Sequence, residues 1–280
     1  MRLKISRLPK MKVILPLIIA LLAGCSPRET SWVALGDSIT YLNEHPDETG
    51  NRITAGYMTR VTRRLPHIHY TNKGFNGWTA GEVAKEIERL GLVKADLYTV
   101  FLGTNDWWRG HPIGTLEDYK NNAGNETFFG SLRIITDHLR GLNDRAQIVL
   151  LTPMQRVDFV YIGNMSNNAY GSYRKRNDQS LAEFAAAISQ VGKLEGFEVI
   201  DLYNESGITH ENLVRFKRLR DPVSGEYKNY LFPDFIDKPF NPLADEYPYP
   251  VEAIDMTYDG LHPSDKGYDV IANMLIDVLK

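Results

Sequence analysis

Residues 32–40 read Trp-Val-Ala-Leu-Gly-Asp-Ser-Ile-Thr, and the fold can be inferred outward from them. The apolar run 32–35 predicts a buried β-strand, and the triplet Gly36-Asp37-Ser38 after it predicts a sharp turn into a helix. A serine at such a turn exposes its hydroxyl above the sheet edge, with its backbone N–H facing the same space. The triplet alone leaves two interpretations open: Ser38 is a nucleophile, or Asp37 and Ser38 only cap the helix.

Four further short apolar runs rich in β-branched residues are expected to form strands. They lie at 67–71, 97–102, 147–151 and 197–202. Amphipathic segments with apolar residues at helical spacing lie at 55–65, 79–90, 126–142 and 177–194, and a last helix is expected at about 264–280. Strands that alternate with helices predict an α/β fold with a parallel sheet.

Two stretches, 154–176 and 204–258, interrupt this alternation. Within the second, Asp221-Pro-Val-Ser-Gly225 separates two strand-like segments and predicts a β-hairpin. Both stretches begin where a strand ends, and ligands of open α/β sheets bind at the C-terminal ends of the strands. We therefore expect one domain over 32–280, with an insertion at about 204–258 that is functional or forms a small subdomain.

The first 24 residues have the features of an export signal. A basic start is followed by an apolar run, 13–23, that is too short for a stop-transfer helix. The sequence Leu22-Ala-Gly-Cys25 resembles the lipobox of bacterial lipoproteins, which implies cleavage after residue 24, lipidation of Cys25 and a short tether at 25–31. The expected location is the cell envelope, anchored to a bacterial membrane and by analogy the outer one. The alternative is an ordinary secretory signal with an incidental cysteine.

The net charge of −3 combines a leader of +5 with a remainder of −8. An acidic surface repels nucleic acid unless a basic stripe overrides it, and the sequence contains no such stripe. We therefore expect no nucleic-acid partner. Since Cys25 is the only cysteine, the folded domain has no thiol nucleophile and no disulfide.

Among the seven histidines, His262 has the best setting for a general base. It lies in Asp259-Gly-Leu-His262-Pro, where a tight turn can fold Asp259 back onto the imidazole and fix its tautomer. Simple helix capping is the alternative for this motif. His67 and His69 share one face of a predicted strand, but no third metal ligand is evident, so a solvated or packed face is expected.

Two further strand ends offer hydrogen-bond donors for an oxyanion. Gly77 lies in a glycine-rich turn that opens a helix, where an unhindered backbone N–H can point into a cleft. Asn105 follows the third strand and carries a neutral side-chain donor. Each residue alone is ordinary, since glycine and asparagine are common in turns.

Taken in order, Ser38 in GDSIT, Gly77 in GFNG, Asn105 in GTND and His262 in DGLHP resemble the four blocks of the GDSL esterases and lipases of the SGNH hydrolase superfamily. The resemblance covers essentially the whole exported domain. It implies a flavodoxin-like three-layer αβα sandwich with a five-stranded parallel sheet. It also implies a Ser38-His262-Asp259 triad and an oxyanion hole of Ser38, Gly77 and Asn105. The G-x-S-x-G elbow of α/β-hydrolases is absent, because Thr40 replaces its second glycine.

The expected activity is ester hydrolysis without a metal or organic cofactor. Trp107, Trp108 and Tyr258 are candidate substrate-binding residues, since aromatic platforms beside polar groups suit sugar rings. We expect the insertion to bring further aromatics toward His262: Tyr227, Tyr230, Phe232, Phe235, Phe240, Tyr247 and Tyr249. Packing of the insertion is the alternative for each of them.

The substrate hypothesis is a small acyl group, acetyl first, on a polysaccharide or other glycoside. A lipase, lysophospholipase or thioesterase would use the same four blocks but would need a contiguous apolar channel, which the polar segment 164–176 does not suggest. A non-catalytic, anchored carbohydrate-binding protein is a further alternative. A pure binder, however, has no need of nucleophile, base and oxyanion donors together.

Overall fold

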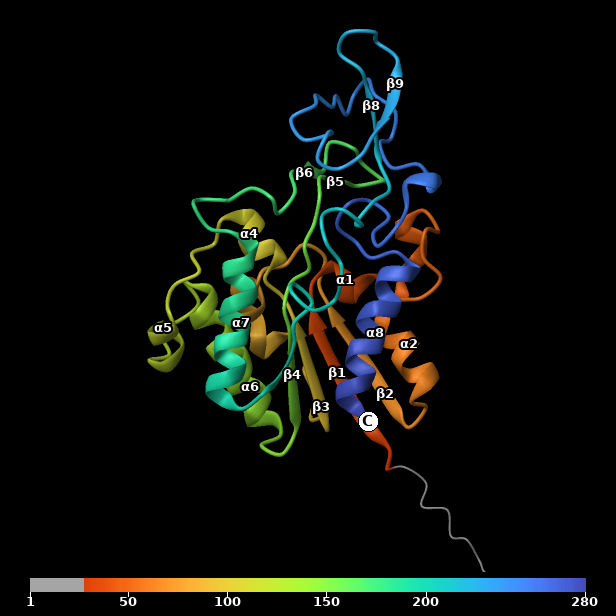
Figure 1. Cartoon of the computed structure of the whole chain (residues 1–280). Coiled ribbons are helices and arrows are strands. Elements are labelled where there is room, and N and C mark those ends of the chain that lie inside the picture. Colours follow the sequence, from red (N-terminus) through yellow and green to blue (C-terminus); the bar gives the residue numbers. More distant parts are fainter. Residues whose placement is uncertain (1–27) are drawn as a thin grey trace, which may run out of the picture.

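The structure, a computed structural model, describes residues 28–280 and has a five-stranded sheet at its centre (Figure 1). The strands are β1 (Thr30–Gly36), β2 (Ile68–Gly74), β3 (Leu97–Phe101), β4 (Gln147–Leu151) and β7 (Glu198–Ile200). Their order is β2-β1-β3-β4-β7, and all neighbouring pairs are parallel. The predicted fold class is confirmed, and each predicted strand lies within a few residues of an observed one.

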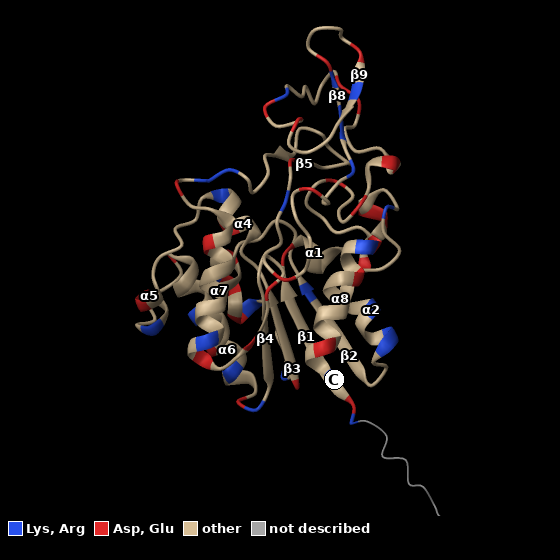
Figure 2. Ribbon diagram, in the orientation of Figure 1, with Lys and Arg blue, Asp and Glu red and all other residues tan. Residues whose placement is uncertain are grey.

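Helices cover both faces of the sheet, which gives three layers (Figure 1). On one side lie α2 (Tyr57–Arg64) and α8 (Asp265–Leu279), whose apolar residues pack with the sheet in one core cluster. On the other side lie α3 (Ala80–Glu86), α6 (Phe128–Leu142) and α7 (Leu181–Glu195), which form a second cluster. Figure 2 shows the charged residues mainly on the helices and loops, while the central strands are almost free of them.

The alternation of side chains along β1 explains why both faces are covered. Trp32 and Ala34 belong to the cluster under α2 and α8, whereas Val33 and Leu35 belong to the opposite cluster. All five residues of β3 are buried. Strands that are buried on both faces consist of nearly continuous apolar residues, so short apolar runs in the sequence were enough to predict their positions.

Capping residues set the helix starts and correct two predicted boundaries. The segment expected from residue 177 begins as a helix only after Ser180, whose side chain forms a capping box with Glu183. Asn177 and Asp178 have positive φ angles, so they belong to the preceding turn. Similarly, α6 begins after Thr127, whose hydroxyl accepts a hydrogen bond from Gly130.

The structure also contains several short helical segments. The one that begins at Ser38 was predicted from the turn after the first strand, and Ile87–Arg89 lies within the predicted segment 79–90. The others were not predicted, because they contain less than two turns of periodic sequence. The short α-helical segments are α1 (Ser38–Tyr41), α4 (Thr104–Arg109) and α5 (Leu116–Lys120). The 3₁₀ segments are Leu42–Glu44, Pro46–Thr49, Ile87–Arg89 and Val251–Ala253. Of these, α1 and α4 directly follow β1 and β3, so the sheet fixes their starting points.

The strand order places a crevice between the ends of β1 and β3. After β1 the chain crosses to β2 on one side, and after β2 it crosses to β3 on the other side of β1. At such a switch point the two connections diverge, and ligands bind in the gap between them. GDSIT and GTND therefore meet at this position.

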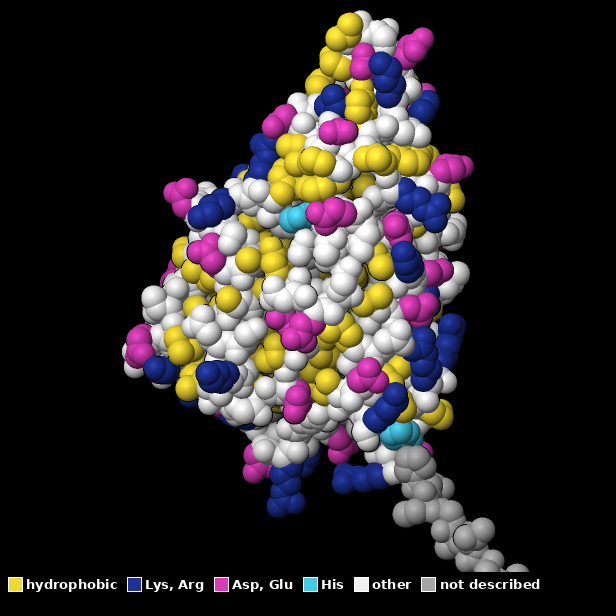
Figure 3. Space-filling view, in the orientation of Figure 1, with side chains coloured by type: hydrophobic (Ala, Val, Ile, Leu, Met, Phe, Trp, Pro, Cys, Tyr) yellow, Lys and Arg dark blue, Asp and Glu magenta, His cyan; other side chains and the backbone are white. Residues whose placement is uncertain are grey.

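The interrupting stretches lie above the C-terminal ends of the strands (Figure 1). The stretch 154–176 contains the small antiparallel pair β5 (Phe159–Val160) and β6 (Asn168–Ala169). The predicted hairpin is present as β8 (Lys217–Arg220) and β9 (Tyr227–Tyr230), and it projects from the top of the molecule. Figure 3 shows apolar side chains gathered beneath this projection.

The predicted signal peptide and Cys25 lie outside the described residues. Within 28–280, no helix combines the length and apolar character needed to cross a bilayer. The lipid anchor therefore stays a prediction from the sequence.

Candidate active site

Ser38 is held at the tip of β1 by its neighbours. Asp37 caps α1 through a 3.0 Å hydrogen bond from the backbone N–H of Ile39. Ser38 is the first residue of α1, so its own N–H has no partner within the helix. Among residues 28–280, no hydrogen bond occupies this N–H. The serine thus presents a hydroxyl and a free backbone donor at one position.

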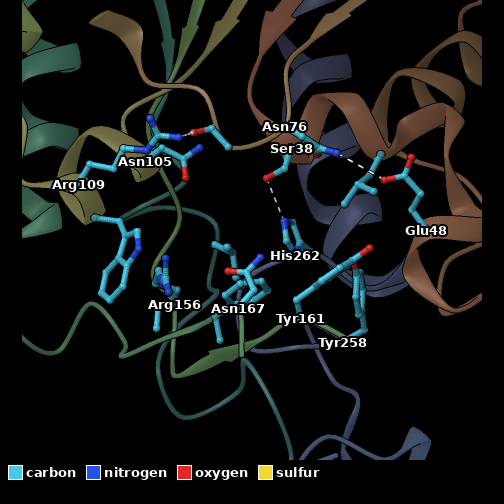
Figure 4. Close-up of a pocket in the computed structure, with 16 residues that line it drawn as sticks. Ser38, Glu48, Asn76, Asn105, Arg109, Arg156, Tyr161, Asn167, Tyr258 and His262 are labelled. Atoms are coloured by element: carbon cyan, nitrogen blue, oxygen red, sulfur yellow. Dashed lines mark hydrogen bonds between the residues drawn. The ribbon is translucent and has the colours of Figure 1, made fainter. Parts of the chain in front are cut away.

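A continuous chain of hydrogen bonds links the predicted triad, and Figure 4 shows the bond between Ser38 and His262. His262 Nε2 lies 2.9 Å from Ser38 Oγ, and His262 Nδ1 lies 2.7 Å from Asp259 Oδ2. The other carboxylate oxygen, Asp259 Oδ1, accepts from the backbone N–H groups of Leu261 and His262 at 3.0 and 2.7 Å. The aspartate is fully buried and orients the imidazole with its acceptor nitrogen toward the serine.

The tight turn between Asp259 and His262 depends on Gly260. Its φ of +91° is disfavoured for residues with a Cβ, and a Cβ there would lie 2.1 Å from the carbonyl oxygen of Asp158. Two aromatic rings then hold the imidazole: Tyr258 stacks on it with centroids 5.8 Å apart, and Phe159 meets it edge to face at 5.4 Å. The imidazole is therefore held by Asp259, Tyr258 and Phe159, with its other nitrogen toward Ser38.

The structure also places Gly77 and Asn105 at the same pocket as Ser38. Gly77 has φ +72°, and no hydrogen bond occupies its N–H among the described residues. Asn105 Nδ2 donates to the carbonyl oxygen of Trp78 at 3.0 Å and to Asp37 Oδ2 at 3.4 Å. The second contact is long, so it is the one that an oxyanion can replace.

Asp106 and Arg109 support these donors and were not singled out from the sequence. Both carboxylate oxygens of buried Asp106 accept from the N–H of Ala80, at the start of α3. Arg109 donates to the carbonyl oxygen of Gly77 at 2.6 Å and to Glu82 at 2.7 Å. The turn after β2 is therefore tied to the helix after β3. The only sequence signal was their position shortly after Asn105, at one and four residues.

Burial raises the pKa of Asp37 to about 6. Loss of solvent around the carboxyl is the largest cause, and the hydrogen bond from Ile39 and the nearby His262 partly oppose it. The Asp37 carboxyl, next to Ser38, therefore changes its charge near pH 6, which can be reached in an assay.

The site lies in a cavity of about 420 Å³ at the ends of the strands. Figure 4 shows Ser38 and His262 facing each other, with Glu48 and Asn76 on one side and Asn105 and Arg109 on the other. The remaining lining residues are Leu42, Gly77, Trp108, Arg156, Phe159, Tyr161, Asn167, Ala169, Tyr258 and Leu261. Most of the sixteen carry polar side chains, three of which are charged.

Only two of the three predicted aromatic residues line the cavity. Trp108 and Tyr258 line the cavity. Trp107 does not: it is fully buried, and its Nε1 donates to the carbonyl oxygen of Gln179. A helical turn places successive residues about 100° apart, so only one of the two tryptophans can face the site.

Apart from Tyr258, the aromatics of the insertion do not line this cavity. Phe235 and Tyr249 are fully buried in the core cluster under α8, and Phe232, Phe240 and Tyr247 pack against it. The packing alternative therefore holds for these residues. Instead, Phe159 and Tyr161 from the earlier stretch 154–176 line the pocket, and sequence reasoning did not name them.

Two other histidines are hydrogen-bonded to neighbouring side chains. His111 Nδ1 lies 3.0 Å from Asp106 Oδ1, and this hydrogen bond, in which the carboxylate accepts, is the main reason that the pKa of His111 is raised. His210 lies 2.9 Å from Ser172 Oγ. Over 28–280, no group of three or more His, Cys, Asp or Glu side chains is arranged to hold a metal ion.

The geometry is that of a serine hydrolase triad on a parallel α/β sheet. The further oxyanion donors, Gly77 and Asn105, follow the two strands on either side of β1. Residues 34–270 match the model of the GDSL-like lipase/acylhydrolase family, and the chain belongs to this family of ester hydrolases. A search of curated proteins found no match.

Solved structures with this fold include proteins described as lipases and as esterases. A possible lipase from Chitinophaga pinensis is 56% identical, with a TM-score of 0.89 over 90% of this chain and 98% of that one. An acetyl xylan esterase is 16% identical, with a TM-score of 0.54 over 89% of this chain and 100% of that one. A mutant of an acetyl-xylooligosaccharide esterase from Geobacillus is 18% identical, with a TM-score of 0.51, covering 89% and 94%. The latter two show a shared fold.

Proposed function

We propose that the protein is a serine esterase that removes small acyl groups, acetyl first, from a carbohydrate or glycoside. The observation that carries this proposal is the polar lining of the cavity around the Ser38-His262 pair. Sugar rings expose hydroxyls at their edges and C–H groups on their faces. A pocket that combines Glu48, Asn76 and Asn167 with Trp108 and Tyr161 offers partners for both.

In the proposed mechanism, Ser38 Oγ attacks the ester carbonyl carbon while His262 Nε2 takes the hydroxyl proton. The N–H groups of Ser38 and Gly77 and the Asn105 amide stabilise the oxyanion. His262 then gives the proton to the departing sugar oxygen, and an acyl-enzyme remains on Ser38. Water repeats these steps and releases the carboxylic acid. Asp259 stabilises the imidazolium throughout.

A lipase-like activity is the second candidate. It is favoured by the similarity to the structure described as a possible lipase. A long acyl chain needs a contiguous apolar surface, whereas the lining of this pocket is interrupted by charged and amide side chains.

Acyl-chain selectivity separates these two functions. Purified protein is assayed on para-nitrophenyl acetate, butyrate, octanoate and palmitate and on peracetylated xylose and glucose, with Ser38→Ala as the inactive control. We expect kcat/KM to fall with chain length and the acetylated sugars to be deacetylated. Turnover of only the long esters would overturn the carbohydrate proposal. Equal rates for wild type and Ser38→Ala would overturn the esterase proposal.

We also propose that the protein is exported and attached to a bacterial membrane through lipid on Cys25. The lipobox-like sequence before this residue supports the proposal. Expression of the full chain should place the wild type in the membrane fraction and Cys25→Ser in the soluble fraction or in an uncleaved form. Equal distribution of the two would contradict it.

A further inference from the structure

Arg156 is a buried cation in the wall of the catalytic pocket. It lies five residues beyond the end of β4, is 1% exposed and lines the cavity. Its backbone is fixed by Ser172, whose Oγ accepts from the Arg156 N–H at 3.0 Å and whose N–H donates to the Arg156 carbonyl at 2.8 Å. The next residue, Val157, donates to the carbonyl of Gly260 in the catalytic turn. Arg156 is thus built into the frame that holds His262.

The guanidinium of Arg156 is not paired in the usual way. Its buried Nε and Nη2 atoms have no hydrogen-bond partner among residues 28–280. The rings of Trp107, Trp108 and Phe159 lie around it, with the guanidinium carbon 5.6, 5.4 and 5.9 Å from their centroids. Aromatic faces recover part of the cost of burying a cation, but they accept no directed N–H hydrogen bond of ordinary strength.

Neighbouring charges do not neutralise Arg156 directly. The nearby carboxylates are Asp259, which is bound to His262, and Asp158, which pairs with Lys217 at 2.7 Å. Burial lowers the pKa of Arg156 to about 10, which still leaves it protonated at neutral pH. By contrast, Arg109 in the same pocket pairs with Glu82. Arg156 therefore brings an uncompensated positive charge to the site.

A second cavity of about 270 Å³ adjoins the first, and both are lined by Phe159 and Ala169. It also has more cations than anions. Arg174 and Lys217 are paired with Asp237 and Asp158, whereas Lys238 lies over the ring of Tyr230 at 4.2 Å. In a chain with a net negative charge, this local excess of positive charge along adjoining cavities favours anionic ligands.

We propose that Arg156 binds a carboxylate of the substrate, so that the preferred substrates are esters that carry a carboxylate close to the scissile bond. Guanidinium groups prefer carboxylates because two parallel N–H···O bonds can form, and a buried pair is strengthened by the low local dielectric. The inference rests on the proposed esterase function. The carboxylate can belong to the alcohol part, as in an acetylated uronic acid, or to the acyl part, as in a hemisuccinate.

Matched substrates test this proposal on the wild-type protein. One pair is acetylated glucuronic acid and acetylated glucose, and the other is para-nitrophenyl hemisuccinate and para-nitrophenyl butyrate. We expect kcat/KM to be about tenfold higher or more for the acidic member of one pair, mainly through KM, as loss of a hydrogen bond to a charged group predicts. The pair that shows the preference identifies which part of the substrate carries the carboxylate.

Variants then assign the preference to Arg156. Arg156→Met should remove the preference, Arg156→Lys should keep part of it, and the exposed Arg63→Met on α2 should leave it unchanged. As a readout without turnover, inactive Ser38→Ala should bind glucuronate more tightly than glucose in calorimetry, and the double variant with Arg156→Met should lose this difference.

The possible failures are distinguishable. If wild type hydrolyses no ester, the proposed function is wrong. If it hydrolyses esters without preferring either acidic substrate, only the role of Arg156 is overturned. If Arg156→Met lowers both members of a pair equally and shifts the pH profile of kcat, Arg156 acts on the Asp259-His262 pair, and the substrate-binding proposal is likewise overturned.

Discussion

The two sides of the catalytic pocket differ in how their polar groups are paired. At the ends of β1 and β3, Asp37, Asn105 and Asp106 all have hydrogen-bond partners within the protein. On the side formed by 154–176, Arg156 is buried with two nitrogen atoms that have no partner in the described part of the chain. The first side holds its geometry without a substrate, as transition-state stabilisation requires. The second side carries the buried positive charge to which, in our proposal, a carboxylate of the substrate binds.

The largest effect is expected at the reacting atom of the first side. Ser38→Ala should lower kcat on para-nitrophenyl acetate by about 10⁴-fold or more, because no other described group is placed to form the acyl-enzyme. Ser166→Ala, an exposed serine in the loop before β6, is the matched control and should keep wild-type activity. Activity of Ser38→Ala close to that of the control would contradict the role of Ser38 as the nucleophile.

A smaller loss is expected when an oxyanion donor is removed. Asn105→Ala should lower kcat by about 10²-fold or more with little change in KM, since the donor acts on the charge that develops in the transition state. Asn229→Ala is the control, because Asn229 is an exposed asparagine on β9 that does not line the pocket. An equal loss in the two variants would contradict the role of Asn105 as an oxyanion donor.

Asp37 gives a pH-dependent test of the same side. Its folded-state pKa is raised to about 6, so the folded protein binds a proton more readily than the unfolded chain. Stability must therefore fall as pH rises from about 4 to 6, and the cost persists above pH 6, up to about 3 kcal/mol. Asp37→Asn keeps an oxygen for the Ile39 N–H and removes the charge.

We expect Asp37→Asn to be more stable than wild type at pH 7 in urea unfolding, with a difference that shrinks toward pH 4. A difference that is independent of pH would contradict the assigned pKa. Enzyme activity need not follow stability here, because Asp37 also contacts Asn105.

The smallest effect is expected at Gly77. An alanine there meets no close atom, since the nearest is Nη2 of Arg109 at 3.7 Å, but it must adopt φ +72°. Gly77→Ala should therefore lower the free energy of unfolding by about 1 kcal/mol. Gly141→Ala, inside α6 with open space around it, should raise it by a similar amount. Loss of stability in both would mean that strain at Gly77 is not the cause.

Sequence reasoning located most of the first side and little of the second. Ser38, Gly77 and Asn105 lie two to four residues beyond a strand end. Parallel strands bring these ends to one edge of the sheet. Arg156 lies in a stretch with no periodicity, where nothing in the order of residues indicates whether an arginine is buried. Trp107 and Trp108 show the same limit, because adjacent positions in a short helix face opposite environments.

By itself, the sequence determined the parallel α/β class, the hairpin, and the four motifs from which a serine esterase can be inferred, because each depends on local pattern and short spacing. Tertiary structure alone decided which aromatics reach the pocket, which residues tie the oxyanion turn together, and that Arg156 is buried beside the catalytic turn. These properties arise from contacts between segments far apart in the chain, whose side chains take their orientation from packing and not from sequence order.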